Sequence, residues 1–172
     1  VVRLFLWWKG EVDVDLSAVG VSKDYRQTDT CNYMSLGLKE AGMVHSGDLV
    51  NAPQGAAEFI DVHLDRLNSQ TRYVVLAANV FSGPAFSKLK ECFVGWQERS
   101  ANTQKGEIME IKTVANKFQV TAPTKGFVGA VFDVKERRLL WLDLPFNSSI
   151  GFSIHGSMRD IVAAVEEFQL YA

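Results

Sequence analysis

The segment GFVGAVFDVKERRLLWLDL, residues 126–144, contains two apolar runs separated by a short polar stretch. The runs cover residues 126–134 and 139–144, and the residues between them read KERR. Apolar runs of this length on either side of a polar turn are typical of a β-hairpin. This part of the chain therefore predicts two antiparallel strands that face each other.

Similar extended runs, separated by Gly, Pro, Asn and Asp, occur along most of the chain. Residues 1–9 are almost continuously apolar, as in a strand that is covered on both faces. In residues 12–16 apolar and acidic side chains alternate strictly, as in a strand with one buried face. Regularly spaced strands without intervening helices favour a β-sandwich of two antiparallel sheets. Further strands are predicted at residues 59–64, 73–81, 92–97, 108–114 and 117–121.

The apolar pattern changes its period at the C-terminal end of the chain. From residue 158 onward apolar side chains recur at the spacing of one helical face, and Ser157 followed by Asp160 is typical of a helix N-cap. We expect one amphipathic helix that packs against a sheet. Because no repeat or low-complexity linker interrupts the sequence, we expect a single domain over residues 1–172. The apolar stripe consists of Met158, Ile161, Val162, Val165 and Phe168.

The composition excludes several classes of protein. Hydrophobic residues make up 47% of the 172 residues and charged residues 22%, which is enough apolar material for a sizeable core. Eighteen basic and twenty acidic residues give a net charge of -2, which disfavours a dedicated nucleic-acid-binding protein. No apolar run approaches the roughly 18 residues of a membrane-spanning helix. Cys31 and Cys92 are too few for a disulfide framework, so we expect reduced thiols and a cytoplasmic location.

Asp13 and Asp15 form the first candidate site. They stand two residues apart in a predicted strand, so both side chains emerge from one face, about 7 Å apart. Carboxylates this close repel each other, and a hard cation such as calcium relieves the repulsion. The alternative interpretation is the solvent-exposed face of a half-buried strand, and the spacing alone favours that alternative.

The stretch HSGDLVNAPQGAAEF, residues 45–59, is the second candidate and reads as a long loop. Asp48, Asn51 and Glu58 supply oxygen-bearing side chains, which suit the irregular coordination of calcium, although the spacing is not that of an EF-hand. The alternative is an ordinary connection between strands. A loop of about a dozen residues is nevertheless long enough to indicate a function.

Signals of catalysis are weak. Ser153 and His155 lie in GFSIHG, which lacks the glycine that a nucleophile elbow needs two residues after the serine. Asp61 and His63 lack a third, orienting residue. The three histidines do not show the paired spacing of a zinc site. We therefore expect a protein that is not an enzyme.

Taken in order, these segments resemble the TerD family of bacterial tellurium-resistance and stress-response proteins. The likeness spans roughly residues 5–144, and the order and spacing of the segments carry it more than any one of them. VDVDLSA is also similar to the VDLDLH-like strand of bacterial domains found beside von Willebrand-type modules, although HSGD fits TerD better. The segments are VDVDLSA (12–18), HSGD (45–48), FIDVHLDRL (59–67), YVVLAANVF (73–81), FSKLKECFVGW (86–96) and FVGAVFDVKERRLLWLDL (127–144).

The resemblance implies a β-sandwich that binds calcium through acidic residues in two places. The acidic strand is matched here by Asp13 and Asp15, and the loop after the HSGD-like motif is matched by Asp48 and Glu58. It also implies a binding domain that answers tellurite or chemical stress through protein partners.

This sequence departs from the family pattern after Asp48, where LVNAPQGAAE carries apolar residues in place of polar or acidic ones. Each lost carboxylate lowers the attraction for the ion, so the resemblance implies a weakened calcium site. The alternative is a metal-free protein-interaction domain within a larger multidomain bacterial protein.

Overall fold

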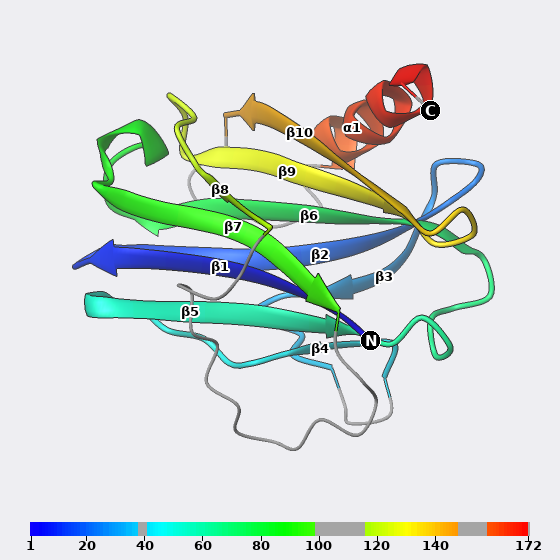
Figure 1. Ribbon diagram of the computed structural model, residues 1–172, viewed down its shortest axis with the longest axis horizontal. Coiled ribbons are helices and arrows are strands. Elements are labelled where there is room, and N and C mark those ends of the chain that lie inside the picture. The colour runs from blue at the N-terminus through cyan, green and yellow to red at the C-terminus, as the bar shows by residue number, and fades with distance from the viewer. Residues whose placement is uncertain (38–40, 99–115, 148–157, 172) are drawn as a thin grey trace.

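The computed structural model describes residues 1–37, 41–98, 116–147 and 158–171, and within it the strands form two stacked five-stranded sheets (Figure 1). The first sheet has the order β4-β5-β1-β7-β8 and the second the order β10-β9-β6-β2-β3. Every pair of neighbouring strands is antiparallel. The predicted β-sandwich of two antiparallel sheets with one C-terminal helix is therefore confirmed.

The bounds of the elements are as follows. The first sheet contains β4 (Met43–His45), β5 (Ala52–Val62), β1 (Val2–Gly10), β7 (Glu91–Glu98) and β8 (Lys117–Gln119). The second sheet contains β10 (Arg138–Phe146), β9 (Gly126–Asp133), β6 (Thr71–Ser82), β2 (Asp13–Ser22) and β3 (Gln27–Cys31). A short 3-10 helix, η1 (Phe86–Lys88), precedes β7, and the chain ends in α1 (Met158–Tyr171).

The main core lies between the two sheets and follows from strand alternation. Leu4, Leu6 and Trp8 of β1 point inward, as do Val14 and Leu16 of β2. Because successive side chains of a strand face opposite ways, the aspartates on either side of Val14 must lie on the outer face of the second sheet. The same alternation that fills the core therefore places two carboxylates on one surface.

Helix α1 covers part of this outer face (Figure 1). Ile161, Val165 and Phe168 are buried against the second sheet, as the apolar stripe predicted. Their neighbours in the sheet include Val19 and Val21 of β2. The predicted cap at Ser157 lies outside the described residues. None of the described helices is both long and apolar enough to cross a lipid bilayer.

Several predicted boundaries were wrong. Strand β2 continues to Ser22, because its second half is covered on both faces and does not alternate. The predicted loop over residues 45–59 is a loop only between β4 and β5, since β5 already begins at Ala52. The short strands β3 and β4 were not predicted. The strand expected at residues 108–114 lies outside the described residues.

One edge of β2 is only partly covered, and this positions the candidate site. Within the described chain β3 pairs with β2 between Ala18 and Val21. The chain then turns away at Asn32, whose side-chain oxygen accepts hydrogen bonds from the N–H groups of Met34 and Ser35, both at 3.0 Å. The Leu16 backbone is left for side chains of β4 and β5, because its carbonyl oxygen lies 3.2 Å from His45 Nε2 and its N–H donates to Glu58.

Candidate metal centre

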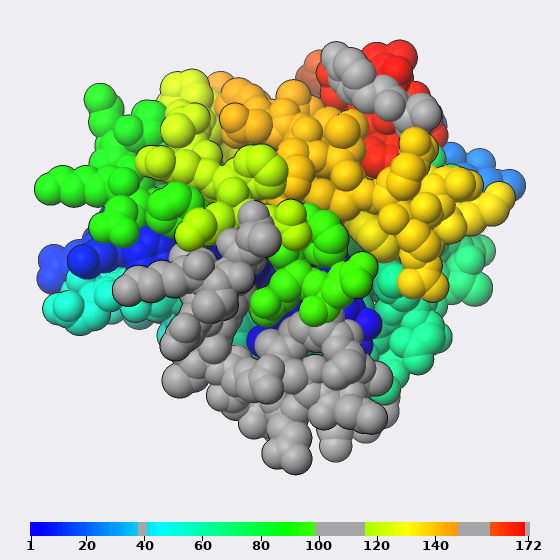
Figure 2. All heavy atoms as spheres, in the orientation of Figure 1, coloured from blue at the N-terminus to red at the C-terminus, as the bar shows by residue number. Residues whose placement is uncertain are grey.

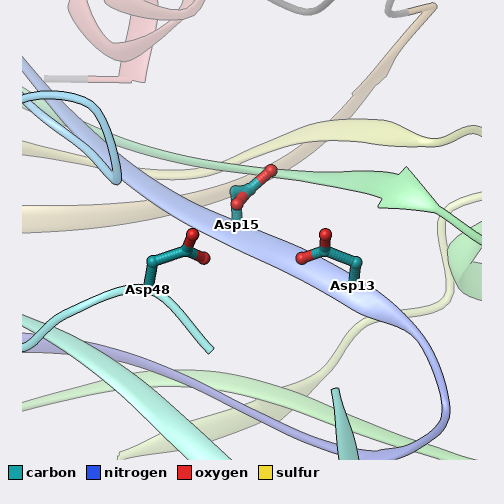
Figure 3. A group of neighbouring side chains, drawn as sticks. All are labelled: Asp13, Asp15 and Asp48. Carbon is teal, nitrogen blue, oxygen red and sulfur yellow. The ribbon is translucent and has the colours of Figure 1, made fainter. Parts of the chain in front are cut away.

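Three carboxylates meet at the start of β2. Asp13, Asp15 and Asp48 each offer an oxygen, and these three oxygens all lie within 4.8 Å of one another. Figure 3 shows the Asp13 and Asp48 carboxylates pointing toward each other with Asp15 between them. Asp15 is only 3% exposed, Asp13 is half-buried and Asp48 is exposed. The group therefore has a buried floor and an open side through which an ion can enter.

The surroundings of Asp13 and Asp15 disfavour the charged forms of both side chains. Burial raises the pKa of Asp15 from its ordinary 3.8 to about 7, and the charges of Asp13, Glu58 and Asp48 also raise it. The pKa of Asp13 is likewise raised, by burial first and then by the charges of Asp48 and Glu58. A raised pKa means that the carboxylate form is disfavoured as the site stands. A bound cation would offset the repulsion among these carboxylates and favour their charged forms.

Two buried oxygens of this group, one on Asp13 and one on Asn79, lack hydrogen-bond donors among the described residues. Asn79 of β6 lies directly opposite Asp15 and donates from Nδ2 to Asp15 Oδ2 at 3.3 Å. Its Oδ1 is buried and has no hydrogen-bond partner among the described residues, and the same holds for Asp13 Oδ1. Asn79 itself is only 1% exposed. Because unsatisfied buried oxygens are costly and rare, these two atoms fit a group that is positively charged or donates hydrogen bonds.

Glu58 has a different environment from the three aspartates. It is fully buried, and its two carboxylate oxygens accept hydrogen bonds from the backbone N–H groups of Leu16, at 3.0 Å, and Leu49, at 2.9 Å. These contacts join the uncovered edge of β2 to the segment that carries Asp48. Of the four predicted ligands, the structure therefore groups three, whereas Glu58 binds backbone amides and positions the Asp48 segment.

His45 and Gly47 explain the HSGD motif. His45 Nδ1 accepts a hydrogen bond from the Gly47 N–H at 3.0 Å, so the ring proton must sit on Nε2. That atom lies 3.2 Å from the Leu16 carbonyl oxygen and 3.3 Å from Glu58 Oε2. Gly47 has φ of 120°, a conformation that other residues rarely adopt. The motif is thus a fixed turn that presents the next residue, Asp48, to the start of β2.

Sequence reasoning did not identify Asn79, and it treated His45 only as a failed zinc ligand. The signal for Asn79 is a single amide within the apolar run YVVLAANVF, where a polar side chain needs a specific partner. The exposed Asn51 also lies between β4 and β5.

The residues considered for catalysis are placed elsewhere. Asp61 accepts two hydrogen bonds from Arg3, both at 2.7 Å, and forms an ion pair across β1 and β5. Burial and the charge of Arg66 lower the pKa of His63. Ser153 and His155 lie outside the described residues.

Comparison with known proteins adds information about the fold. The sequence matches no protein-family model and no curated protein. A similar solved structure is that of SAV2460, a protein of unknown function, with a TM-score of 0.63 and 14% identity over 86% of this chain and 90% of that chain. Another is SCO6318 from Streptomyces coelicolor A3(2), described as a homologue of the telluride resistance protein TerD. Its TM-score is 0.61, with 14% identity over the same shares of the two chains. The chain therefore has a TerD-like fold, as the resemblance predicted.

Proposed function

We propose that this chain is a non-enzymatic binding domain that takes up one divalent cation, calcium, between Asp13, Asp15 and Asp48. The observation that carries the proposal is the meeting of three carboxylate oxygens within 4.8 Å beside two buried oxygens that lack donors. The second part of this observation distinguishes the site from an ordinary acidic surface. It supports a site that binds a positively charged ligand.

The donor set suits calcium. Calcium binds 6–8 oxygen atoms in flexible geometry, and carboxylates and amide carbonyls are its usual ligands. Asp13, Asp15 and Asp48 would hold the ion, with Asn79 as an additional oxygen donor and water completing the shell. When bound, the ion supplies the positive charge that allows Asp15 to ionise. Because Glu58 is occupied by backbone amides, we expect a weak site, with a Kd on the order of 10⁻⁴–10⁻³ M.

Ion binding would also order the surface next to the site. Leu49 and Val50 follow Asp48 directly, and they are 40% and 62% exposed. A cation that joins Asp48 to β2 would fix the position of these apolar side chains. We propose that this surface binds a protein partner in a response to tellurite or chemical stress, which the TerD-like fold favours.

Thermal unfolding of the purified chain tests the cation site. Calcium should raise the Tm, because a ligand that binds only the folded state stabilises it. Asp48→Asn should abolish the rise, and because Asp48 is exposed this variant should still fold. Asp65→Asn is the matched control, since its side chain is 79% exposed and belongs to the connection between β5 and β6. Magnesium in place of calcium shows whether the site is selective.

Coincident melting curves of the unaltered chain with calcium and with a chelator would reject the cation site. That result would favour the metal-free interaction domain, which uses the same fold.

A further inference from the structure

A second polar site lies at the opposite end of β2. An open cavity of about 520 Å³ is lined there by residues of three turns. Lys23 and Arg26 come from the β2–β3 turn, Arg72 from the start of β6, and Lys135 from the β9–β10 turn. Figures 1 and 2 show these three turns, blue, blue-green and gold, together at the right-hand end of the molecule. Four cationic residues line the cavity and only one acidic residue, Asp24.

Three of these cations are not neutralised by the protein. Lys23, Arg26 and Lys135 are exposed, and the described part of the chain gives none of them an ion pair. Arg72 differs, because its guanidinium lies 2.7 Å from Asp133 and 3.6 Å from Glu136. In a chain with a net charge of -2, this cavity is a local excess of positive charge. It would attract an anion.

The turns that carry these cations are fixed by local hydrogen bonds. The Ser22 hydroxyl accepts from the Arg26 N–H at 3.1 Å, and the Ser22 N–H donates to the Arg26 carbonyl at 2.8 Å. Asp133 accepts from the N–H groups of Lys135, at 3.0 Å, and Glu136, at 2.9 Å. The two turns therefore hold the Lys23, Arg26 and Lys135 backbone in place, which lowers the entropy lost on binding.

The third turn is fixed in the same way. Asn68 Oδ1 accepts from the Gln70 N–H at 2.9 Å, and the Asn68 carbonyl accepts from the Thr71 N–H at 2.8 Å. This places Ser69 and Gln70, which also line the cavity, beside Arg72. Hydroxyl and amide donors thus stand among the ammonium and guanidinium groups.

We infer that this cavity binds the di- or triphosphate group of a small ligand or headgroup through Lys23, Arg26 and Lys135, with Arg72 fixed at its side. Ammonium and guanidinium groups with neighbouring hydroxyl and amide donors match the oxygens of phosphate. A volume of about 520 Å³ is within the usual size of small-ligand sites. The positive charge of these three unpaired side chains exceeds the negative charge of one phosphate, which favours a ligand with at least two phosphate groups. The inference uses no residue of the metal centre and stands independently of it.

Isothermal titration calorimetry with inorganic pyrophosphate and with ATP tests the inference, in metal-depleted buffer of low salt. We expect binding that weakens as salt is added. The double variant Lys23→Ala, Lys135→Ala should weaken pyrophosphate binding about tenfold or more. The matched control Lys88→Ala, Lys90→Ala removes the same charge from exposed lysines at η1 and just before β7, and its affinity should change less than about twofold.

Further arms of the experiment separate the possible sources of the phosphate. Vesicles of phosphatidylcholine with and without cytidine diphosphate diacylglycerol, whose headgroup contains a diphosphate, test a lipid headgroup. Vesicle binding that pyrophosphate competes away assigns the headgroup, and pyrophosphate binding without vesicle binding assigns a soluble ligand. Asp15→Asn should bind pyrophosphate as the unaltered chain does, because the metal centre is at the other end of β2.

Three results would overturn the inference. The first is no heat with either phosphate probe at low salt together with no vesicle binding. The second is an equal loss of affinity in the two lysine double variants, which would mean attraction to charge in general. The third is loss of pyrophosphate binding in Asp15→Asn. Melting curves of each variant establish that a lost affinity is not lost folding.

Discussion

At each end of β2 a buried carboxylate accepts hydrogen bonds from two backbone N–H groups, but the charges around the two carboxylates differ. At the start of β2, Glu58 is fully buried and accepts hydrogen bonds from two backbone N–H groups. At the other end, Asp133 is 2% exposed and also accepts from two backbone N–H groups. Each carboxylate fixes a connecting segment. They differ in their side-chain partner, which is the His45 imidazole for Glu58 and the permanently charged Arg72 guanidinium for Asp133.

That difference sets the sign of the ligand that we propose for each end. Beside Glu58 the neighbouring charges are those of three further carboxylates, so the ligand that we propose for this end is a cation. Beside Asp133 the protein supplies its own guanidinium, and the remaining lysine and arginine side chains are free to meet an anion. A buried carboxylate can therefore order a loop in two settings. Other carboxylates surround Glu58 and leave a negative site, whereas the Arg72 guanidinium balances the charge of Asp133.

The largest effect should come from removing these two buried carboxylates. Glu58→Ala leaves the Leu16 and Leu49 N–H groups without acceptors, and we expect a loss of about 3–5 kcal/mol in the free energy of unfolding. Asp133→Ala should cost less, about 2–3 kcal/mol, because the Arg72 side chain is 25% exposed and can reach water. Urea-induced unfolding measures both. A greater loss for Asp133→Ala would contradict the comparison.

Saturating calcium should stabilise only those chains in which the metal centre is intact. Calcium at about 100 times its Kd should raise the free energy of unfolding by about 2.7 kcal/mol. This rise should persist in Lys23→Ala, Lys135→Ala and vanish in Asp48→Asn. Thermal melting with calcium across the three proteins provides the measurement. Equal calcium stabilisation in all three would show that the ion binds elsewhere.

The stability of the metal-free chain should fall as pH rises toward 7. The pKa of Asp15 is raised to about 7 from its ordinary 3.8, so the folded state keeps a proton that the unfolded state has lost. The contribution of this group is fully present below about pH 4 and is lost as pH rises through about 7. Unfolding in chelator at pH 5, 6, 7 and 8 should show the fall, and both Asp15→Asn and added calcium should reduce it. A rise in stability relative to Asp15→Asn over this range would refute the assignment.

The smallest effect should be the coupling between the two ends. They are separated by the length of β2, which is about 30 Å for ten residues. Combining Asp15→Asn with Lys23→Ala, Lys135→Ala should therefore change the free energy of unfolding additively, within about 0.5 kcal/mol. Urea unfolding of the single, double and triple variants measures the deviation. A larger deviation would show that β2 transmits a change from one end to the other.

Local sequence patterns predicted the β-sandwich because alternation and period are properties of neighbouring residues. They placed Asp13 and Asp15 on one face, and HSGD pointed to Asp48. They did not predict the position of Asn79, because its contact with Asp15 depends on how β2 and β6 are aligned. They also missed β3 and β4, which are short and lie at the sheet edges.

The function of Glu58 and the basic cavity could not be predicted for a related reason. A glutamate that binds calcium and a glutamate that binds backbone amides have the same sequence signature. Lys23, Arg72 and Lys135 are far apart in the chain, and only the meeting of three turns brings them to one cavity. Such properties arise from tertiary structure, and no local window of the sequence contains them.

The early departure of the chain at Asn32 has a consequence for how such a domain could change. If the ladder of β3 were extended by two residues, ordinary backbone bonds would occupy the edge around Leu16 that Glu58 and His45 now satisfy. Asp48 would then lose the position beside Asp13 and Asp15 that the proposed cation site requires. Replacing Asn32, whose side chain and backbone both hold this turn, is thus a starting point for engineering a chain without the proposed cation site.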